Sequence, residues 1–290
     1  MSAESGSRKL RYISAAVAIP IGVAICIFSP VGFIILATVL INVGVVEFYA
    51  MARNRGFSPH SIIGTLCSIG ICLLAWLSNN PLSMMYALVA AVVIIFTLAM
   101  VRNCRDAMIN ISVTLLGIIY VGWFASHLIL LRQMSGVSET TPFNLMGAGY
   151  VIILLVLLWL GDGGAFFAGI GWGKHKLIPS ISPNKTIEGA IGGVILTVIG
   201  AAVLKELGLL LRSMGILFFP DFTYPVYLLL AVGIAITGQI GDLCESYLKR
   251  DAGLKDTGNL FPGHGGFLDR FDSLLISAPL YYYFLQFANL

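Results

Sequence analysis

The chain has 290 residues, of which 58% are apolar and 11% are charged, and its mean hydropathy is +0.93. A soluble domain usually carries about twice that share of charged side chains, so a water-soluble globular protein is excluded. The net charge of +3 is small, and we expect no nucleic-acid partner. The five cysteines form no C-x-x-C pair, which favours buried thiols over disulfides or a metal centre.

Apolar stretches close to 20 residues recur along the chain, which is the length that crosses the hydrocarbon core of a bilayer. We therefore predict an all-α integral membrane protein with about nine transmembrane helices. The predicted spans are residues 12–28, 31–51, 61–78, 83–101, 109–131, 147–168, 187–204, 225–243 and 271–289. Prolines, which end helices, stand at or near the breaks: Pro30, Pro59, Pro81, Pro142, Pro183 and Pro225.

The basic residues predict how the spans are oriented. With nine spans the termini lie on opposite sides of the membrane, and all 17 lysines and arginines except Arg132, Lys205 and Arg212 fall on the side of the N-terminus. Because cytoplasmic loops carry the excess of basic residues, we expect the N-terminus to be cytoplasmic and the C-terminus to lie outside. The basic stretch before residue 12 lacks a following small-residue cleavage site, so the first apolar stretch is interpreted as a span.

The composition changes along the chain without marking a second domain. Residues 1–150 are almost purely apolar spans with short links, whereas polar and glycine-rich segments gather in residues 151–290. We expect a single polytopic membrane domain over residues 1–290, with the chemistry at the cytoplasmic interface of its C-terminal half.

Three carboxylates gather near the predicted cytoplasmic ends of the last two spans. Asp242 ends one span, and Asp269 and Asp272 begin the next. Carboxylates at membrane depth are costly and usually functional. Three of them approaching one interface suggest a divalent cation such as Mg²⁺, which takes one or two carboxylates together with substrate phosphates.

The segment between these spans is basic and rich in glycine. Its basic residues are Lys249, Arg250, Lys255 and Arg270, and it contains Pro262-Gly263-His264-Gly265-Gly266. Glycines let backbone N–H groups form a concave nest for an anion, so the segment predicts a site for a metal-bound polyphosphate. Taken singly, each residue has an ordinary explanation as a helix cap, a positive-inside marker or a loop residue. Their concentration favours the site.

A second polar cluster runs from Gly161 to Gly193 on the same predicted side, with Asp162 at its start. It includes Lys174, Asn184, Lys185 and Glu188, and the stretch before Glu188 is also typical of an ordinary helix start. Small residues follow at four-residue spacing, which predicts a helix-packing face: Gly189, Gly193, Thr197 and Ala201.

Two further polar side chains lie inside apolar spans. Glu47 either faces the polar site or pairs with Arg53 or Arg55, and the sequence favours neither. His127 is interpreted as a hydrogen-bonded packing residue.

The stretch from Ser246 to Asp272 resembles the signature of the phosphatidate cytidylyltransferases. It has the form S-x-x-K-R-x4-K-D-x-G-x3-P-G-H-G-G-x-x-D-R-x-D, and the upstream S-P-N-K-T-I-E-G and G-K-H-K-L are also similar to that family. The matching segments cover roughly the last 130 residues. Phe166 stands where relatives often have tyrosine, so no role is assigned to a hydroxyl there.

The resemblance implies a Mg²⁺-dependent nucleotidyltransferase that converts CTP and phosphatidate into CDP-diacylglycerol and pyrophosphate, the first committed step of phospholipid synthesis by this route. It also implies a homodimer and a monovalent cation such as K⁺ beside Mg²⁺. Asp242 and Asp269 match the family's metal centre, and Asp272 is a further candidate ligand. The matching catalytic positions are Asp242, Asp269, Lys249, Arg250, Lys255, His264 and Arg270. The candidate substrate-binding residues are Ser246, Lys174, Asn184, Lys185, Gly265 and Gly266.

Three alternatives remain from the residues alone. A secondary transporter or channel would share the spans and carboxylates, but polar residues at one face and the lack of an internal repeat favour an interfacial enzyme. A CTP-using lipid kinase acting on a polyprenol-like alcohol would give a phosphorylated lipid and CDP instead of a CDP-lipid. A non-catalytic membrane scaffold would not need so dense a polar cluster. The compact chain favours a bacterial inner membrane.

Overall fold

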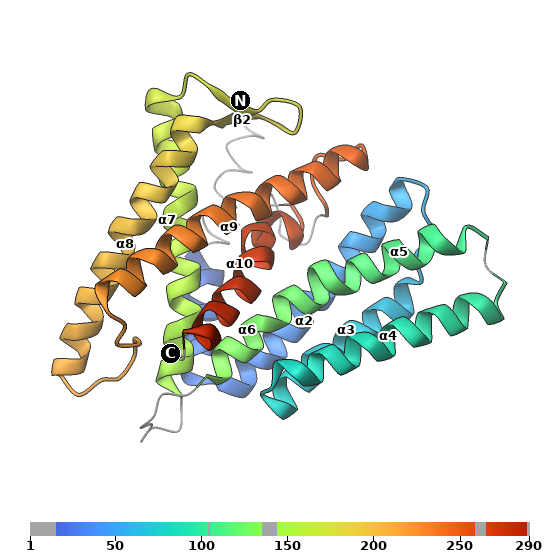
Figure 1. Cartoon of the computed structure of the whole chain (residues 1–290), viewed down its shortest axis with the longest axis horizontal. Coiled ribbons are helices and arrows are strands. Elements are labelled where there is room, and N and C mark those ends of the chain that lie inside the picture. The colour runs from blue at the N-terminus through green and yellow to red at the C-terminus, as the bar shows by residue number, and fades with distance from the viewer. Residues whose placement is uncertain (1–15, 104, 135–143, 259–264, 289–290) are drawn as a thin grey trace. The chain divides into compact units, whose positions relative to one another are not determined.

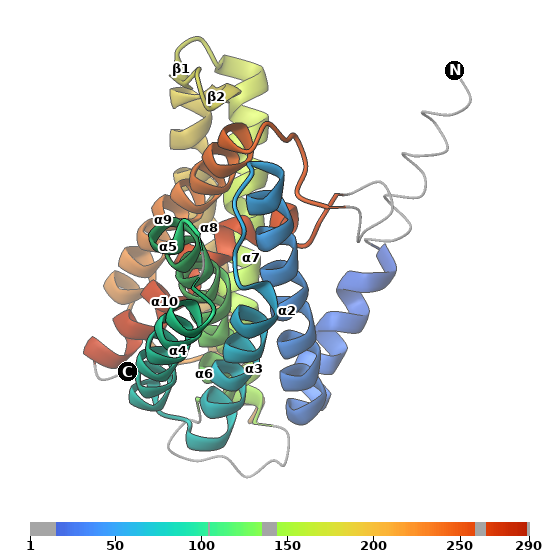
Figure 2. The same cartoon turned by 90° about the vertical axis from the view of Figure 1, so that its right-hand side faces the viewer.

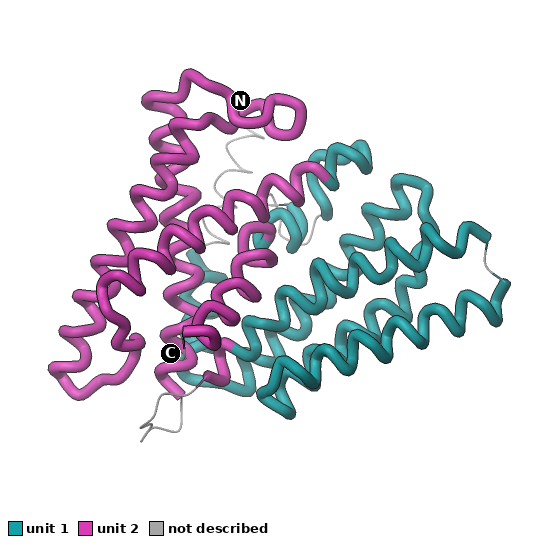
Figure 3. Tube along the Cα trace, viewed as in Figure 1, with its two compact units in different colours: residues 1–130, 248–271 teal, residues 131–247, 272–290 magenta. Residues whose placement is uncertain are grey.

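The computed structural model describes residues 16–103, 105–134, 144–258 and 265–288, and these are almost entirely helical (Figure 1). The chain divides into two compact units, drawn in separate colours in Figure 3. Unit 1 comprises Met1–Leu130 and Leu248–Phe271, and unit 2 comprises Leu131–Tyr247 and Asp272–Leu290. The expectation of one polytopic domain stays a prediction.

Unit 1 begins with the apolar helix Ala16–Phe28 and continues through a series of long apolar helices. These are α2 (Pro30–Asn54), α3 (Ser61–Ser78), α4 (Pro81–Val101), α5 (Ala107–Gly117), a π-helical turn η1 (Ile118–Trp123) and α6 (Phe124–Gln133), whose last residues belong to unit 2. Side chains define the helix starts: Ser29 accepts a hydrogen bond from Gly32 N at 3.1 Å, and Asn80 accepts one from Leu82 N at 2.9 Å. Both caps are followed by proline at the first helical position, as the sequence predicted for these breaks.

The core of unit 1 is built around the fully buried Tyr49 of α2. Its hydroxyl donates to the carbonyl of Thr114 in α5 at 2.8 Å. Its ring passes Gly64 of α3 and Gly117 of α5 so closely that a Cβ at either position would collide with it. Glycines therefore let three helices close around one aromatic ring.

Unit 2 contains α7 (Leu145–Trp172), a β-hairpin, α8 (Ile187–Ser213), most of α9 (Tyr224–Asp251) and most of α10 (Leu268–Phe287). The antiparallel strands β1 (Lys176–Ile178) and β2 (Ser182–Thr186) lie at one end of α7 and α8 (Figure 2). The hairpin was not predicted from the sequence. The prediction that Glu188 lies in the first turn of the following helix is confirmed.

The predicted packing face on α8 is confirmed by its contact with α7. The backbones approach so closely that a Cβ on Gly193 would lie 2.8 Å from the carbonyl oxygen of Gly161, and one on Gly189 would lie 2.8 Å from that of Ala165. Thr197 also donates to the carbonyl of Leu157 at 3.3 Å. Small residues thus allow two membrane helices to gain dispersion contacts along their length.

The fold class predicted from the sequence, an all-α integral membrane protein, is confirmed. Seven helices of the described chain are long and apolar enough to cross a membrane: α2, α3, α4, the continuous segment Ala107–Gln133, α7, α8 and α9. The count of nine is not confirmed. The predicted span 12–28 corresponds to a shorter described helix, Ala16–Phe28, and the predicted span 271–289 corresponds to α10, which is not among the seven.

The α7–α8 contact predicts different outcomes for two neighbouring glycines. A Cβ on Gly164 would lie 2.7 Å from the carbonyl oxygen of Gly192, whereas a Cβ on Gly163 would meet nothing within 4 Å. Gly164→Ala should therefore cost about 1–3 kcal/mol through overpacking. Gly163→Ala should be neutral or slightly stabilising, because alanine restricts the unfolded chain. Thermal unfolding of both variants in one detergent checks this, and equal melting temperatures would contradict it.

Candidate functional site

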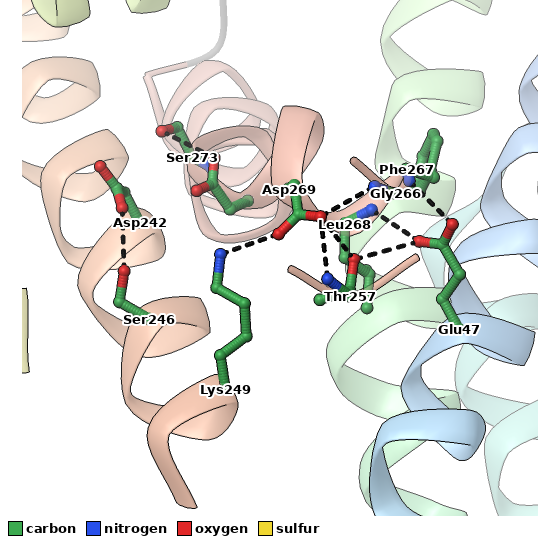
Figure 4. Close-up of polar contacts among 11 residues, drawn as sticks. Glu47, Asp242, Ser246, Lys249, Thr257, Gly266, Phe267, Leu268, Asp269 and Ser273 are labelled. Carbon is green, nitrogen blue, oxygen red and sulfur yellow. Dashed lines mark hydrogen bonds and ion pairs between the residues drawn. The ribbon is translucent and has the colours of Figure 1, made fainter. Parts of the chain in front are cut away.

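In unit 1, the carboxylate of Asp269 receives four hydrogen bonds (Figure 4). Oδ1 accepts one from Lys249 Nζ at 2.8 Å. Oδ2 accepts three, from Gly266 N at 2.8 Å, Thr257 N at 2.9 Å and Thr257 Oγ1 at 3.0 Å. Asp269 stands in the first turn of α10, before its apolar part, and Lys249 stands in the last turn of α9.

These donors keep Asp269 ionised although its side chain is only 6% exposed. Burial disfavours the charged form, but the hydrogen bonds from Lys249, Gly266 and Thr257 outweigh it and hold the pKa of Asp269 below its ordinary value. The carboxylate is thus a fixed negative charge beside a lysine that is itself only 14% exposed.

A second carboxylate of unit 1, that of Glu47 on α2, binds the same loop from the other side. It accepts hydrogen bonds from the backbone N–H groups of Phe267 and Leu268, both at 3.0 Å, and from the Thr257 hydroxyl at 3.4 Å. Of the two roles that the sequence left open for Glu47, the structure supports contact with the polar segment. The signal in the sequence was a carboxylate inside an apolar span.

The other predicted residues of unit 1 lie around this network. Arg250, Lys255 and Arg270 are exposed. The predicted nest is used by the chain itself, because Gly266 N donates to Asp269 and a Cβ on Gly265 would lie 2.6 Å from Asp269 Oδ2. His264 lies outside the described residues.

In unit 2, Asp242 of α9 pairs with Lys185 of β2. Its Oδ2 lies 2.5 Å from Lys185 Nζ, and its Oδ1 accepts a weak hydrogen bond from Ser246 at 3.4 Å, one turn along α9. The two charged side chains are 33% and 27% exposed, so the pair is open to solvent. Asp162 of α7 lies close enough to interact electrostatically with both of them. The structure therefore brings together residues that are 80 positions apart in the sequence.

The hairpin that carries Lys185 is held by Glu188. This carboxylate accepts hydrogen bonds from the backbone N–H groups of Lys174 and His175, at 3.1 Å and 3.2 Å, and it lies 2.6 Å from His175 Nδ1. Lys174 and Asn184 are exposed on the hairpin segment. Glu188 thus fixes the segment that carries Lys174 and Lys185.

Asp272 of α10 lies in unit 2 next to the helix that carries Asp242. A Cβ on Gly241 would lie 2.5 Å from the carbonyl oxygen of Asp272, so the two helices touch through their backbones at this point. Asp272 Oδ1 accepts hydrogen bonds from Ser273 N at 2.6 Å and Ser273 Oγ at 3.3 Å. One oxygen of Asp272 is therefore engaged by the next residue of the same helix.

The carboxylates of Asp242 and Asp269 supply oxygen atoms, which are the ligand type that hard cations prefer. Each has an oxygen that faces a lysine ammonium, which marks a position where positive charge is stabilised. No group of three or more acidic, histidine or cysteine side chains that could hold a metal occurs within the part of the chain that the structure describes. Mg²⁺ typically uses only one or two carboxylates and completes its shell with phosphates and water. The metal ligands predicted from the sequence stay a prediction.

Comparisons with known proteins cover nearly the whole chain. The model of the Cytidylyltransferase family matches residues 9–288. A phosphatidate cytidylyltransferase of Staphylococcus haemolyticus (strain JCSC1435) is 34% identical over 278 residues, covering 94% of this chain and 96% of that protein. The phosphatidate cytidylyltransferase of Bacillus subtilis (strain 168) is 30% identical over 281 residues, covering 96% and 97%. That of Staphylococcus aureus (strain COL) is 31% identical, covering 94% and 96%.

The buried Lys249–Asp269 pair predicts a large effect of removing the lysine. Lys249→Met would leave Asp269 buried with one donor fewer, so we expect the free energy of unfolding to fall by about 3 kcal/mol. The control is Arg55→Met, which breaks the exposed pair with Asp251 and should cost less than about 1 kcal/mol. Unfolding by titration with a denaturing detergent measures both, and equal losses would contradict the prediction.

Proposed function

The chain belongs to the Cytidylyltransferase family, and we propose that it transfers the cytidylyl group of CTP to phosphatidate, giving CDP-diacylglycerol and pyrophosphate. The observation that carries this proposal is the signature from Ser246 to Asp272, together with relatives of that activity over nearly the full length of the chain. As an integral membrane protein, the enzyme meets its lipid substrate within the bilayer.

The reaction requires charge neutralisation and alignment more than a strong base. The phosphate of phosphatidate is already anionic, so it needs no proton removed before it attacks the α-phosphorus of CTP. The bond from the α-phosphorus to the bridging oxygen then breaks, and pyrophosphate leaves. Catalysis thus depends on cations that hold two phosphate-bearing substrates in line.

Unit 1 supplies one set of such cations. Arg250, Lys255 and Arg270 are exposed on the segment that Asp269 and Lys249 fix in place. We assign to them, with Lys249, the binding of the triphosphate and the lipid phosphate, because guanidinium and ammonium groups complement phosphate oxygens. His264 keeps its predicted catalytic role in this proposal, as Gly265 and Gly266 keep theirs in substrate binding.

Unit 2 supplies a second set. Lys185 pairs with Asp242, and Lys174 and Asn184 lie on the same hairpin segment. These residues are candidates for the lipid phosphate or the leaving pyrophosphate, and Ser246 supports Asp242 from the next turn of α9.

Asp242 and Asp269 are the residues that we propose to hold Mg²⁺, with Asp272 as a further ligand or as a partner that orients Arg270. When bound, the ion would neutralise charge on the α-phosphate and the leaving pyrophosphate. The proposal includes a monovalent cation such as K⁺ beside it. The assignment of Asp242 and Asp269 to a cation site is supported by the lysine ammonium group that each of these carboxylates faces.

We further propose a bacterial plasma-membrane location with the N-terminus and the site cytoplasmic, the C-terminus outside, and assembly as a homodimer. The three basic residues that the sequence assigns to the outer side all have local partners in unit 2. Lys205 and Arg212 bind Asp221 at 2.8 Å and 3.1 Å, and Arg132 donates to the carbonyl of Asn144 at 3.0 Å. The three basic residues on the predicted outer side thus have partners within the protein, which supports the proposed orientation.

Replacing Asp242 tests the proposed site. Asp242→Ala should abolish turnover while the protein stays folded in the membrane, because the loss removes a proposed metal ligand and the partner of Lys185. The control is Asp251→Asn on the same helix, whose exposed pair with Arg55 has no assigned role in the reaction. Initial rates and melting temperatures are measured for both, and near-normal turnover of Asp242→Ala would remove Asp242 from the site.

The reaction itself is tested with purified protein, phosphatidate, Mg²⁺ and CTP labelled at the α-phosphate. We expect label to enter the lipid phase and EDTA to prevent it, because the CDP-lipid retains the α-phosphate. No labelled lipid from folded protein would overturn the proposed function. Transfer from γ-labelled CTP to a lipid alcohol would then identify a lipid kinase instead.

A further inference from the structure

Glu47 is a carboxylate of the first 150 residues that binds the signature segment within unit 1. It lies inside α2, is 9% exposed, and binds no lysine or arginine among the described residues. Its partners are instead two consecutive backbone N–H groups at the start of α10 and the Thr257 hydroxyl. Glu47 thus supplies from another helix the acceptors that the N-terminus of α10 needs.

The Thr257 hydroxyl joins the two carboxylates of unit 1. It lies 3.4 Å from Glu47 Oε2 and 3.0 Å from Asp269 Oδ2 (Figure 4). Three consecutive backbone N–H groups also bind these two carboxylates. Gly266 N donates to Asp269, and the N–H groups of Phe267 and Leu268 donate to Glu47. A shift of Glu47 would therefore move the same main chain that orients Asp269.

Packing leaves Glu47 little room to move. A Cβ on Gly258 would lie 2.6 Å from Glu47 Oε1, and a Cβ on Gly266 would lie 2.6 Å from Glu47 Oε2. One turn earlier on α2, Gly44 accommodates the ring of Phe267, which would lie 2.5 Å from a Cβ there. The loop is thus held to α2 by an apolar contact and a carboxylate on one helix face.

We propose that Glu47 is a positioning residue for cytidylyl transfer: it fixes the main chain of residues 266–268 and Thr257, and thereby the orientation of Asp269 and its partner Lys249. The inference rests on the proposed function, because that function assigns Asp269 and Lys249 to the reaction. Glu47 touches neither of these two side chains in the described contacts.

The chemistry requires a carboxylate at this position. Glu47 Oε1 accepts from Phe267 N, and Oε2 accepts from Leu268 N and Thr257 Oγ1, so both oxygens face donors. Glutamine has nearly the same shape but replaces one oxygen with an NH₂ group, which is a donor only. Glu47→Gln would set that group against an N–H donor and so break the anchor without opening a cavity.

The test compares Glu47→Gln with Asn42→Ala in the full-length protein in detergent. Asn42 is a matched control because it is also buried on α2 and its amide group donates only within that helix, to Thr38 O at 2.8 Å. Hydrogen–deuterium exchange of residues 265–271, the melting temperature, and the rate and half-saturating CTP concentration of CDP-diacylglycerol formation are measured.

For Glu47→Gln we expect exchange at Phe267 and Leu268 to rise about tenfold or more while exchange elsewhere in unit 1 stays near wild type. The maximal rate should fall about tenfold or more, because a displaced catalytic group loses alignment, and the half-saturating CTP concentration should change. Asn42→Ala should leave all of these readouts near wild type. A merely structural role would lower the melting temperature and raise exchange throughout unit 1, with the half-saturating concentration unchanged.

A second pair of variants keeps the proposal testable if Glu47→Gln fails to fold. Thr257→Val removes the hydroxyl that contacts both carboxylates, so the maximal rate of CDP-diacylglycerol formation should fall. Thr257→Ser keeps the hydroxyl, so its maximal rate should stay near that of the wild type. Unchanged exchange at Phe267 and Leu268 in Glu47→Gln, or equal rates of the two Thr257 variants, would overturn the positioning role. Absence of cytidylyl transfer by the wild-type protein would instead overturn the proposed function, which distinguishes the two failures.

Discussion

The constraint on which this structure depends is that carboxylates in apolar surroundings must find their donors within the chain. An ionised group without partners in such surroundings would cost several kcal/mol. Asp269 meets this need with a lysine, the Thr257 hydroxyl and two backbone N–H groups. Glu47 meets it with two backbone N–H groups and shares the same Thr257 hydroxyl at the longer distance of 3.4 Å. Thr257 and residues 266–268 are thereby held in place by two negative charges. Much of the fold of unit 1 around the signature serves to bring donors to them.

The glycines of the signature follow from the same constraint. A backbone N–H reaches a carboxylate at hydrogen-bond distance only if the main chain comes close, and a side chain on Gly258 or Gly266 would collide with Glu47. Glycine is thus needed for approach at these two positions. At Gly265 a positive φ of 84° adds a conformational reason, because other residues rarely adopt it. A glycine-rich loop predicts that an anion is bound, but here the bound anions include the chain's own carboxylates.

The sequence could predict what depends on local pattern. Apolar length predicted the membrane helices, prolines predicted the breaks at Pro30 and Pro81, and four-residue spacing predicted the packing face of α8. It could not predict the partners of Glu47, because these lie 210 to 221 residues away along the chain. Nor could it predict the hairpin. Its five-residue strand β2 contains a proline, and the local pattern is typical of the segment that precedes a helix. The predicted span 271–289 differs from the seven spans of the structure because α10 combines tyrosines and a polar first turn with an otherwise apolar helix.

The two lysine–carboxylate pairs differ in exposure, and this difference bears on how each could serve an anionic substrate. Lys249 and Asp269 are 14% and 6% exposed, and Asp269 has three further hydrogen bonds. Separating them would strand a buried charge, so this pair suits a fixed scaffold whose field acts on the substrate as a unit. Lys185 and Asp242 are 27% and 33% exposed, and the only other bond to that carboxylate among the described residues is the weak one from Ser246. Because solvent and ions compensate the charges of an open pair, separating Lys185 from Asp242 costs little, which is what the proposed binding of a phosphate by Lys185 would need. The chain thus contains one buried ion pair in unit 1, which is costly to separate, and one open pair in unit 2, which is cheap to separate.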